Sequence, residues 1–184
     1  MSSPARTDDL SLDPNPGALE LDPRERDFMK HLYELIPTPR AAKRFVNIYR
    51  LIRASITSEL ELSWFLDGRE FMSVQVLLAM VTGAPAEASV ILRKLLALPT
   101  QAPWTTNWWD IVDGVVTEGG EEPSWKSFAT RLQPLRESGE VPATCEGFRK
   151  WADDVARYSF YSGRVLLGSQ LRSPTPPEPP KPKA

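Results

Sequence analysis

The stretch REFMSVQVLLAMVT, residues 69–82, decides the fold of this chain. Apolar side chains occur almost all round a helix of about 3.6 residues per turn, so the stretch predicts a central helix buried on every side. Gly83 is typical of a helix end, and Pro85 is typical of the first turn of a new helix. This next helix should end at Pro99, because proline cannot continue a helix.

Further helices are expected on both sides of this pair. The helices predicted upstream cover residues 23–36, 39–56 and 59–66. Asp22 and Thr38 are suitable N-caps for the first two, and Pro37 ends the first. Downstream, apolar residues at helical spacing predict helices within residues 108–115, 125–135 and 148–158. Pro134 should kink or split the middle one of these three.

The fold class follows from this pattern. No segment alternates polar and apolar residues between turn signals, so no sheet is predicted. We expect an all-α fold, an irregular multi-helix bundle of about six to eight helices with disordered N- and C-terminal tails. The predicted organisation is a tail (1–21), a helical domain (22–168, with core helices in 22–98 and an extension in 99–168) and a proline-rich tail (169–184). That last tail is either a solvated end or a ligand for a proline-recognising groove.

Composition excludes several kinds of site. The 184 residues carry a formal net charge of −2 and contain one histidine, His31, and one cysteine, Cys145. A zinc site of the usual Cys/His kind cannot be built from these two residues, and we interpret His31 as a surface histidine. The lone cysteine fits a reducing compartment, so a cytoplasmic location is expected, and no apolar run is long enough to cross a membrane. We therefore expect no metal site and no catalytic residues, and so no enzyme.

The most informative polar segment is TPRAAKRFVNIYRLIRASI, residues 38–56, which contains five cations and no acid. Residues three and four apart stack on one side of a helix. We call this side the basic stripe, and its members are Arg40, Lys43, Arg44, Asn47 and Arg50. Such a concentration of donors near a helix start suits an anion such as phosphate.

Four interpretations of the basic stripe remain open from the residues alone. It could be a solvated face, or it could pair internally with the acidic stretch 110–122. It could bind a phosphate group or a protein. The last alternative is a nucleic-acid-binding helical protein that uses residues 39–56.

The same residues carry a resemblance to a known family. The run Pro39-Arg40-x-x-Lys43-Arg44-x-x-Asn47-x-Tyr49-Arg50-Leu51 resembles the P-R-x-x-K-R-x-x-N-x-[YF]-R-L segment of bacterial KAP-type P-loop NTPases and their STAND-like relatives. In those proteins the segment lies in the helical region that follows the nucleotide-binding core. The turn from Gly83 to Pro85 is similar to a Gly-x-Pro turn of the helical lid, where proline approaches the nucleotide base. The likeness covers roughly residues 22–98.

The resemblance has definite implications. The chain lacks a G-x-x-x-x-G-K-[ST] loop, so it would be a lid-like module without the NTPase core, a fragment or a split partner. The basic stripe would then face a nucleotide phosphate or the core itself. The implied partner is such a core or another protein, and ATP would be bound only together with that core. No cofactor is expected for the chain in isolation.

Overall fold

The computed structural model describes residues 20–99 and 106–158. Within these ranges the chain forms eight α-helices, one 3₁₀ helix and no strand, which confirms the predicted all-α class. The elements are α1 (Pro23–Met29), η2 (Lys30–Leu35), α2 (Pro39–Ala54), α3 (Glu59–Asp67), α4 (Glu70–Gly83), α5 (Pro85–Ala97), α6 (Trp108–Gly119), α7 (Pro123–Glu137) and α8 (Glu146–Arg157). The predicted tails lie outside the described residues except for Glu20 and Leu21, as does the predicted extension from 159 to 168.

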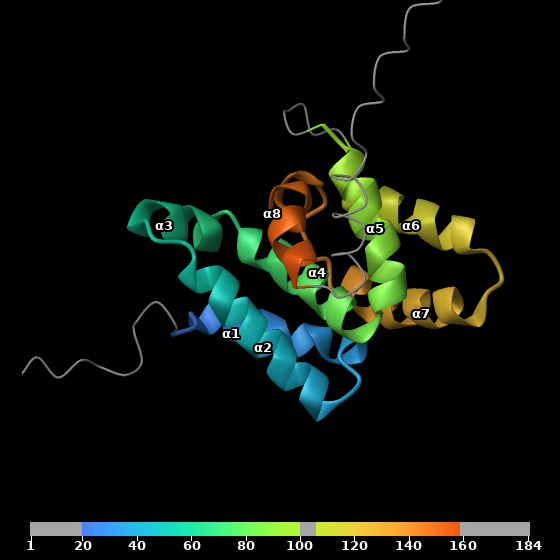
Figure 1. Ribbon diagram of the computed structural model, residues 1–184, viewed down its shortest axis with the longest axis horizontal. Coiled ribbons are helices and arrows are strands. Elements are labelled where there is room, and N and C mark those ends of the chain that lie inside the picture. The colour runs from blue at the N-terminus through green and yellow to red at the C-terminus, as the bar shows by residue number, and fades with distance from the viewer. Residues whose placement is uncertain (1–19, 100–105, 159–184) are drawn as a thin grey trace, which may run out of the picture.

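Helix α4 is the central element, as residues 69–82 predict. Every residue from Ser73 to Val81 is buried. In Figure 1 α4 runs through the middle of the molecule, and α8, α2, α5 and α3 pack around it. A helix covered in this way needs an apolar side chain in nearly every direction, and this explains why the stretch has no polar face.

The ends of α4 and α5 are set by close packing. A Cβ atom at Gly83 would lie only 1.6 Å from the carbonyl oxygen of Leu35, so only glycine fits where α4 meets η2. Pro85 occupies the first turn of α5, where its missing N–H costs no helical hydrogen bond. The predicted helix end and helix start are therefore confirmed.

The predicted caps are also confirmed, although the first helix changes its type. Asp22 accepts a hydrogen bond from the backbone N–H of Arg24 at 2.8 Å, and Thr38 Oγ1 accepts from Ala41 N at 3.1 Å. The predicted helix 23–36 is α-helical only to Met29 and continues as the 3₁₀ helix η2. In a 3₁₀ helix residues three apart lie on the same side, so Leu32 and Leu35 both reach the core.

Of the two effects predicted for Pro134, a kink or a split, the split does not occur. Helix α7 is continuous from Pro123 to Glu137. The proline lies close to the C-terminal end of the helix, where the loss of one N–H bond affects only the last turns. Leu132 and Leu135, on either side of it, stay buried, and their burial holds this end of α7 in place.

Helices α6 and α8 meet through aromatic stacking and a short backbone bridge. The rings of Trp108 and Phe148 lie parallel, with centroids 3.8 Å apart. Trp108 N donates to Ala143 O at 2.7 Å, and Cys145 N donates to Thr106 O at 3.2 Å. Burial, and to a lesser degree the carboxylate of Asp110, raise the pKa of the Cys145 thiol to about 11. The thiol is therefore a neutral part of the core.

Glu25 joins three of the helices through its buried carboxylate and its backbone carbonyl. Glu25 in α1 is fully buried and accepts hydrogen bonds from Asp22 N, at 2.6 Å, from the Tyr49 hydroxyl, and from Arg53 Nε, at 3.0 Å. The backbone carbonyl of Glu25 accepts from Gln75 Nε2 of α4 at 3.1 Å. Burial and the nearby carboxylate raise the pKa of Tyr49, so its phenol stays protonated and donates. We call these five residues the Glu25 network.

Truncation of the core at Leu78 provides the first test of this arrangement. Leu78 is fully buried in α4, so Leu78→Ala should lower the free energy of unfolding by about 2–5 kcal/mol. Leu51→Ala is the matched control, because Leu51 is 55% exposed and its truncation leaves no internal cavity. Urea denaturation followed by circular dichroism measures both. Equal losses for the two variants would contradict the central placement of α4.

The Glu25 network makes a separate prediction. Glu25→Ala removes the acceptor of Tyr49 and the carboxylate beside the buried guanidinium of Arg53, so it should cost about 3–5 kcal/mol. Asp27→Ala in the same helix is the control, because Asp27 forms only an exposed pair with Lys30 and its loss should hardly change stability. Thermal and urea unfolding of both variants would check this. A Glu25 variant as stable as the Asp27 variant would contradict it.

Candidate functional site

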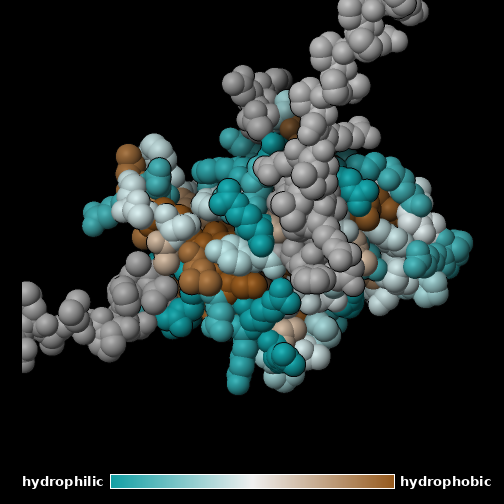
Figure 2. Space-filling view, viewed as in Figure 1, coloured by the Kyte–Doolittle hydropathy of each residue, from teal (hydrophilic) through white to brown (hydrophobic). Residues whose placement is uncertain are grey.

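Four members of the basic stripe are exposed along α2. Arg40, Lys43, Arg44 and Asn47 face solvent, and Arg50 is half-buried. Figure 2 shows hydrophilic side chains at the lower end of α2, where the helix begins, and a hydrophobic area over its upper half. The structure therefore brings the first four predicted residues together on one surface at the start of α2.

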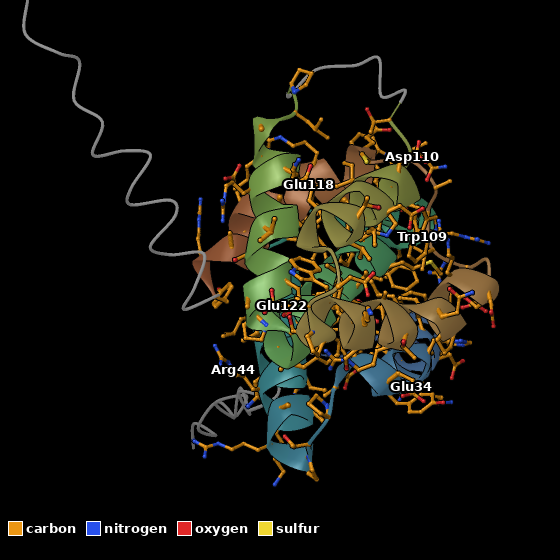
Figure 3. The ribbon with its side chains drawn as sticks, turned by 90° about the vertical axis from the view of Figure 1, so that its right-hand side faces the viewer. Glu34, Arg44, Trp109, Asp110, Glu118 and Glu122 are labelled. Atoms are coloured by element: carbon orange, nitrogen blue, oxygen red, sulfur yellow. The ribbon has the colours of Figure 1, made fainter. Side chains whose placement is uncertain are left out.

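The acidic stretch 110–122 does not neutralise this surface. Figure 3 shows Asp110 and Glu118 beside α6, well above Arg44 on α2. Acids of that stretch instead bind cations on other helices: Asp113 with Arg136, Glu118 with Lys94, and Glu121 with Lys126. Three of the five acids in this stretch are thus paired around α6 and α7 and not with the basic stripe.

Three cations of α2, Arg44, Arg50 and Arg53, already have contacts of their own. Arg53 is buried and bound to Glu25, as described above. Arg44 Nη2 donates to the backbone carbonyl of Tyr158, at the C-terminal end of α8, at 3.1 Å. Arg50 lines a shallow hollow of about 400 Å³ together with Glu20 and Arg26. By contrast, the side chains of Arg40 and Lys43 form no hydrogen bond or ion pair with any residue in 20–99 or 106–158.

The turn at Gly83 and Pro85 lies in a packed environment. The backbone of Gly83 rests against the carbonyl of Leu35, and its own carbonyl accepts from Arg131 Nη1 at 3.3 Å. Pro85 is half-buried at the start of α5. The residue types at this turn are thus accounted for by packing, without any ligand.

A pocket that sequence reasoning missed lies between α1, η2 and the turn from α3 to α4. Its volume is about 480 Å³, within the range of about 300–1,000 Å³ that is typical of small-molecule sites. Phe28 and Phe71 form part of its wall and meet edge to face, with centroids 6.1 Å apart. His31 and Glu140 line the rim, with His31 Nε2 3.6 Å from the Glu140 carboxylate. The predicted surface histidine is indeed exposed, and it also borders this pocket.

The pocket contains the one non-glycine residue with positive φ in the described chain. Arg69, the N-cap of α4, has φ 57° and ψ 21°, and its side chain makes no capping hydrogen bond. The left-handed conformation costs an L-residue about 1–2 kcal/mol. The preceding Gly68 adopts an ordinary right-handed geometry, with φ −75°. The strained conformation therefore falls on the arginine although a glycine is next to it.

Most charges around the pocket are already neutralised within the chain. Arg24 contacts Asp67 at 3.0 Å, and Asp27 contacts Lys30 at 2.7 Å. These contacts lower the pKa values of Asp67 and Asp27 below their usual range, so both carboxylates are ionised at neutral pH. Arg69 differs, because it has no hydrogen bond or ion pair to its side chain within the part of the chain that the structure describes.

Sequence spacing could not reveal this pocket, because its residues come from positions 24–31, 66–72 and 140. The local signal was an arginine immediately after Asp67-Gly68, at the N-cap of a strong helix, where Ser, Thr, Asp, Asn or Gly are preferred. Nothing in the described ranges groups three or more His, Cys, Asp or Glu side chains for a metal.

Comparison with known proteins provides no relative. No family model, no curated protein and no solved structure matches the chain. In the described part of the chain, no helix has both the length and the apolar character to cross a membrane. The candidate sites of the chain are therefore the basic stripe on α2 and the pocket at Arg69.

The strain at Arg69 leads to a stability prediction. Arg69→Gly should raise the free energy of unfolding by roughly 0.5–1.5 kcal/mol, because glycine adopts positive φ without a steric penalty. Arg69→Ala is the matched control, since it removes the same side chain but keeps the Cβ atom that causes the strain. Urea denaturation of both variants measures the difference. If alanine stabilises as much as glycine, the effect comes from the charge and the strain argument is wrong.

Proposed function

We propose that this chain is a non-catalytic helical module that docks through the start of α2 onto an anionic group held by another molecule. One observation supports this function: Arg40 and Lys43 are exposed side by side on one helical turn and have no partner in the described residues. Three acids of the stretch 110–122, namely Asp113, Glu118 and Glu121, are bound to cations other than these two. A cationic surface without an internal counter-charge favours an external anion.

The position of these cations on the helix strengthens the proposal. Arg40 and Lys43 lie in the first two turns of α2, where positive charge is opposed by the helix dipole. A bound anion would reverse this unfavourable term, because it interacts well with both the side chains and the helix start. Phosphate suits the site best, since it accepts several hydrogen bonds at once from arginine and lysine.

The resemblance to the helical region of P-loop NTPases suggests which kind of molecule holds the phosphate. An arginine and lysine cluster without a phosphate-binding loop and a metal ion binds free nucleotide weakly. The proposed partner is therefore a nucleotide-bound NTPase core or another protein that holds the phosphate in place. In this role Arg40 and Lys43 would contact the phosphate, and Asn47 would extend the contact by one turn.

Nucleic-acid binding through residues 39–56 is the alternative, and the geometry favours it less. Arg53 is buried against Glu25, Arg44 is bound to the end of α8, and Arg50 is half-buried with a contact of its own, so three of the five cations are already engaged. The cations that remain, Arg40 and Lys43, cover only a short surface. The phosphates of a duplex form a long row, with one charge per about 1.7 Å of the helix axis.

A titration with tripolyphosphate tests the proposal, because this ion mimics the phosphates of a nucleotide. Amide signals of residues 39–47 should shift in ¹H–¹⁵N spectra, and Arg40→Ala/Lys43→Ala should weaken binding on the order of tenfold. The melting temperature should stay unchanged, because both side chains are exposed. Arg93→Ala/Lys94→Ala on α5 is the control, since it changes the net charge equally and should leave binding intact.

Two outcomes would contradict this function. One is an equal loss of affinity in the α5 control, which would indicate a general charge effect. The other is unfolding of the Arg40 variant, which would give Arg40 a structural role. A parallel titration with a 20-base-pair duplex tests the alternative. For a nucleic-acid-binding protein, a plot of the logarithm of the binding constant against the logarithm of the salt concentration would have a slope of about −0.9 per phosphate contacted.

A further inference from the structure

A groove of about 240 Å³ lies where α3, the start of α4 and α8 meet, and two of its lining residues are tryptophans. We call it the tryptophan groove, and it is lined by Ile56, Glu61, Trp64, Glu70, Lys150 and Trp151. We propose that it binds residues 174–183, within the proline-rich tail of the same chain. The inference is separate from the proposed function, because the tryptophan groove and the basic stripe share no residue.

Trp64 provides an aromatic surface that the fold leaves open. The residue is 60% exposed, and Leu60, one turn earlier on the same side of α3, is 58% exposed. Within residues 20–99 and 106–158, the Trp64 ring packs on no other aromatic ring and its indole N–H has no acceptor. Proline rings pack on such aromatic surfaces, and the indole N–H can donate to a carbonyl of the bound peptide.

The second tryptophan of the groove is held firmly in place. The ring of Trp151 packs edge to face against Phe65, with centroids 5.3 Å apart, and its Nε1 donates to Glu70 at 2.9 Å. Lys150 also binds Glu70, at 2.7 Å. The tryptophan groove therefore combines a fixed aromatic side chain with an exposed one, so little ordering is needed when a peptide binds.

The charges at the groove favour a basic peptide. Glu70 is balanced by Lys150, whereas the carboxylate of Glu61 forms no ion pair with any residue of the described ranges. Glu59 is also exposed in the first turn of α3, and its side chain likewise has no ion pair in the part of the chain that the structure describes. The negative charge that remains beside the groove is complementary to lysine.

Residues 174–183 have the composition that this groove favours. They contain six prolines and the lysines Lys181 and Lys183. Closely spaced prolines favour the polyproline II helix, which is ordered before binding and docks onto aromatic grooves. The lysines directly follow four of these prolines, so they can lie near Glu61 while the prolines contact the tryptophans. Aromatic surface and charge thus select the same segment.

The length of the connection allows this contact. Residues 159–173 join Tyr158, at the end of α8, to Pro174. Fully extended, this stretch spans up to about 50 Å. Trp151 lies two turns before Tyr158, only about 10 Å away along the helix. A tether that spans the distance easily gives an effective concentration on the order of millimolar, so even a weak contact would be occupied.

Substitution of the prolines in the full chain tests the contact. Replacement of Pro176, Pro177, Pro179 and Pro180 by alanine, the four-proline variant, keeps every charge and should shift the indole N–H signal of Trp64 in ¹H–¹⁵N spectra. Pro14→Ala/Pro16→Ala, near the other end of the chain, is the matched control and should leave this signal unchanged. The shift should not depend on protein concentration, because the contact lies within one chain.

A synthetic peptide of residues 173–184 provides the second test. It should bind the four-proline variant at least about fivefold more tightly than the parent chain, whose groove already holds its own tail. Adding Trp64→Ala to the four-proline variant should abolish this binding, and Tyr33→Ala, which removes another exposed aromatic side chain, should leave it intact. Trp64 is exposed, so its removal should not unfold the chain.

Four outcomes would overturn the inference. The first is an unchanged Trp64 signal in the four-proline variant, and the second is an equal shift in the Pro14/Pro16 control. The third is a Trp64 signal that depends on protein concentration, which would place the contact between two copies of the chain. The fourth is peptide binding that is absent from the four-proline variant or that persists after Trp64→Ala.

Discussion

The buried carboxylate of Glu25 is the constraint on which the arrangement of the N-terminal half depends. A charged group in the core is tolerated only when hydrogen bonds replace its hydration, and here the donors come from the cap of α1 and from two residues of α2. The backbone of the same residue binds Gln75 in α4. Because these partners must all reach one residue, the rotation of α2 about its own axis is fixed. The basic stripe faces solvent as a direct consequence.

The structure therefore divides the cations of α2 by their position on the helix. Arg53 lies on the inner side and balances Glu25, whereas Arg40 and Lys43 lie beyond the core at the start of the helix. Similar residues on one helix thus lie in different surroundings, one in a buried ion pair and the others exposed to solvent. The proposed docking surface follows from this division, because the side chains of Arg40 and Lys43 have no counter-charge in the described part of the chain.

The helices could be predicted from the sequence because their signals are local. Proline, the capping residues Asp22 and Thr38, and the unbroken apolar run of α4 act within a few residues of one another. What the sequence did not reveal depends on contacts between distant residues. The pairing of Glu25 with Arg53, the 3₁₀ geometry of η2 and the continuity of α7 through Pro134 are set by packing. The basic stripe was predictable as a helical spacing, whereas the pocket at Arg69 required the folded chain.

The burial of Cys145 has a consequence for the study of motion in this domain. Its thiol sits at the N-cap of α8, fully enclosed and held in the neutral form. Thiolate is the species that reacts with alkylating reagents, so the native chain should resist them. Any labelling at this sulfur would report the transient separation of α8 from the rest of the fold. The single cysteine can thus serve as an intrinsic chemical probe for the opening of α8, the last helix of the described residues.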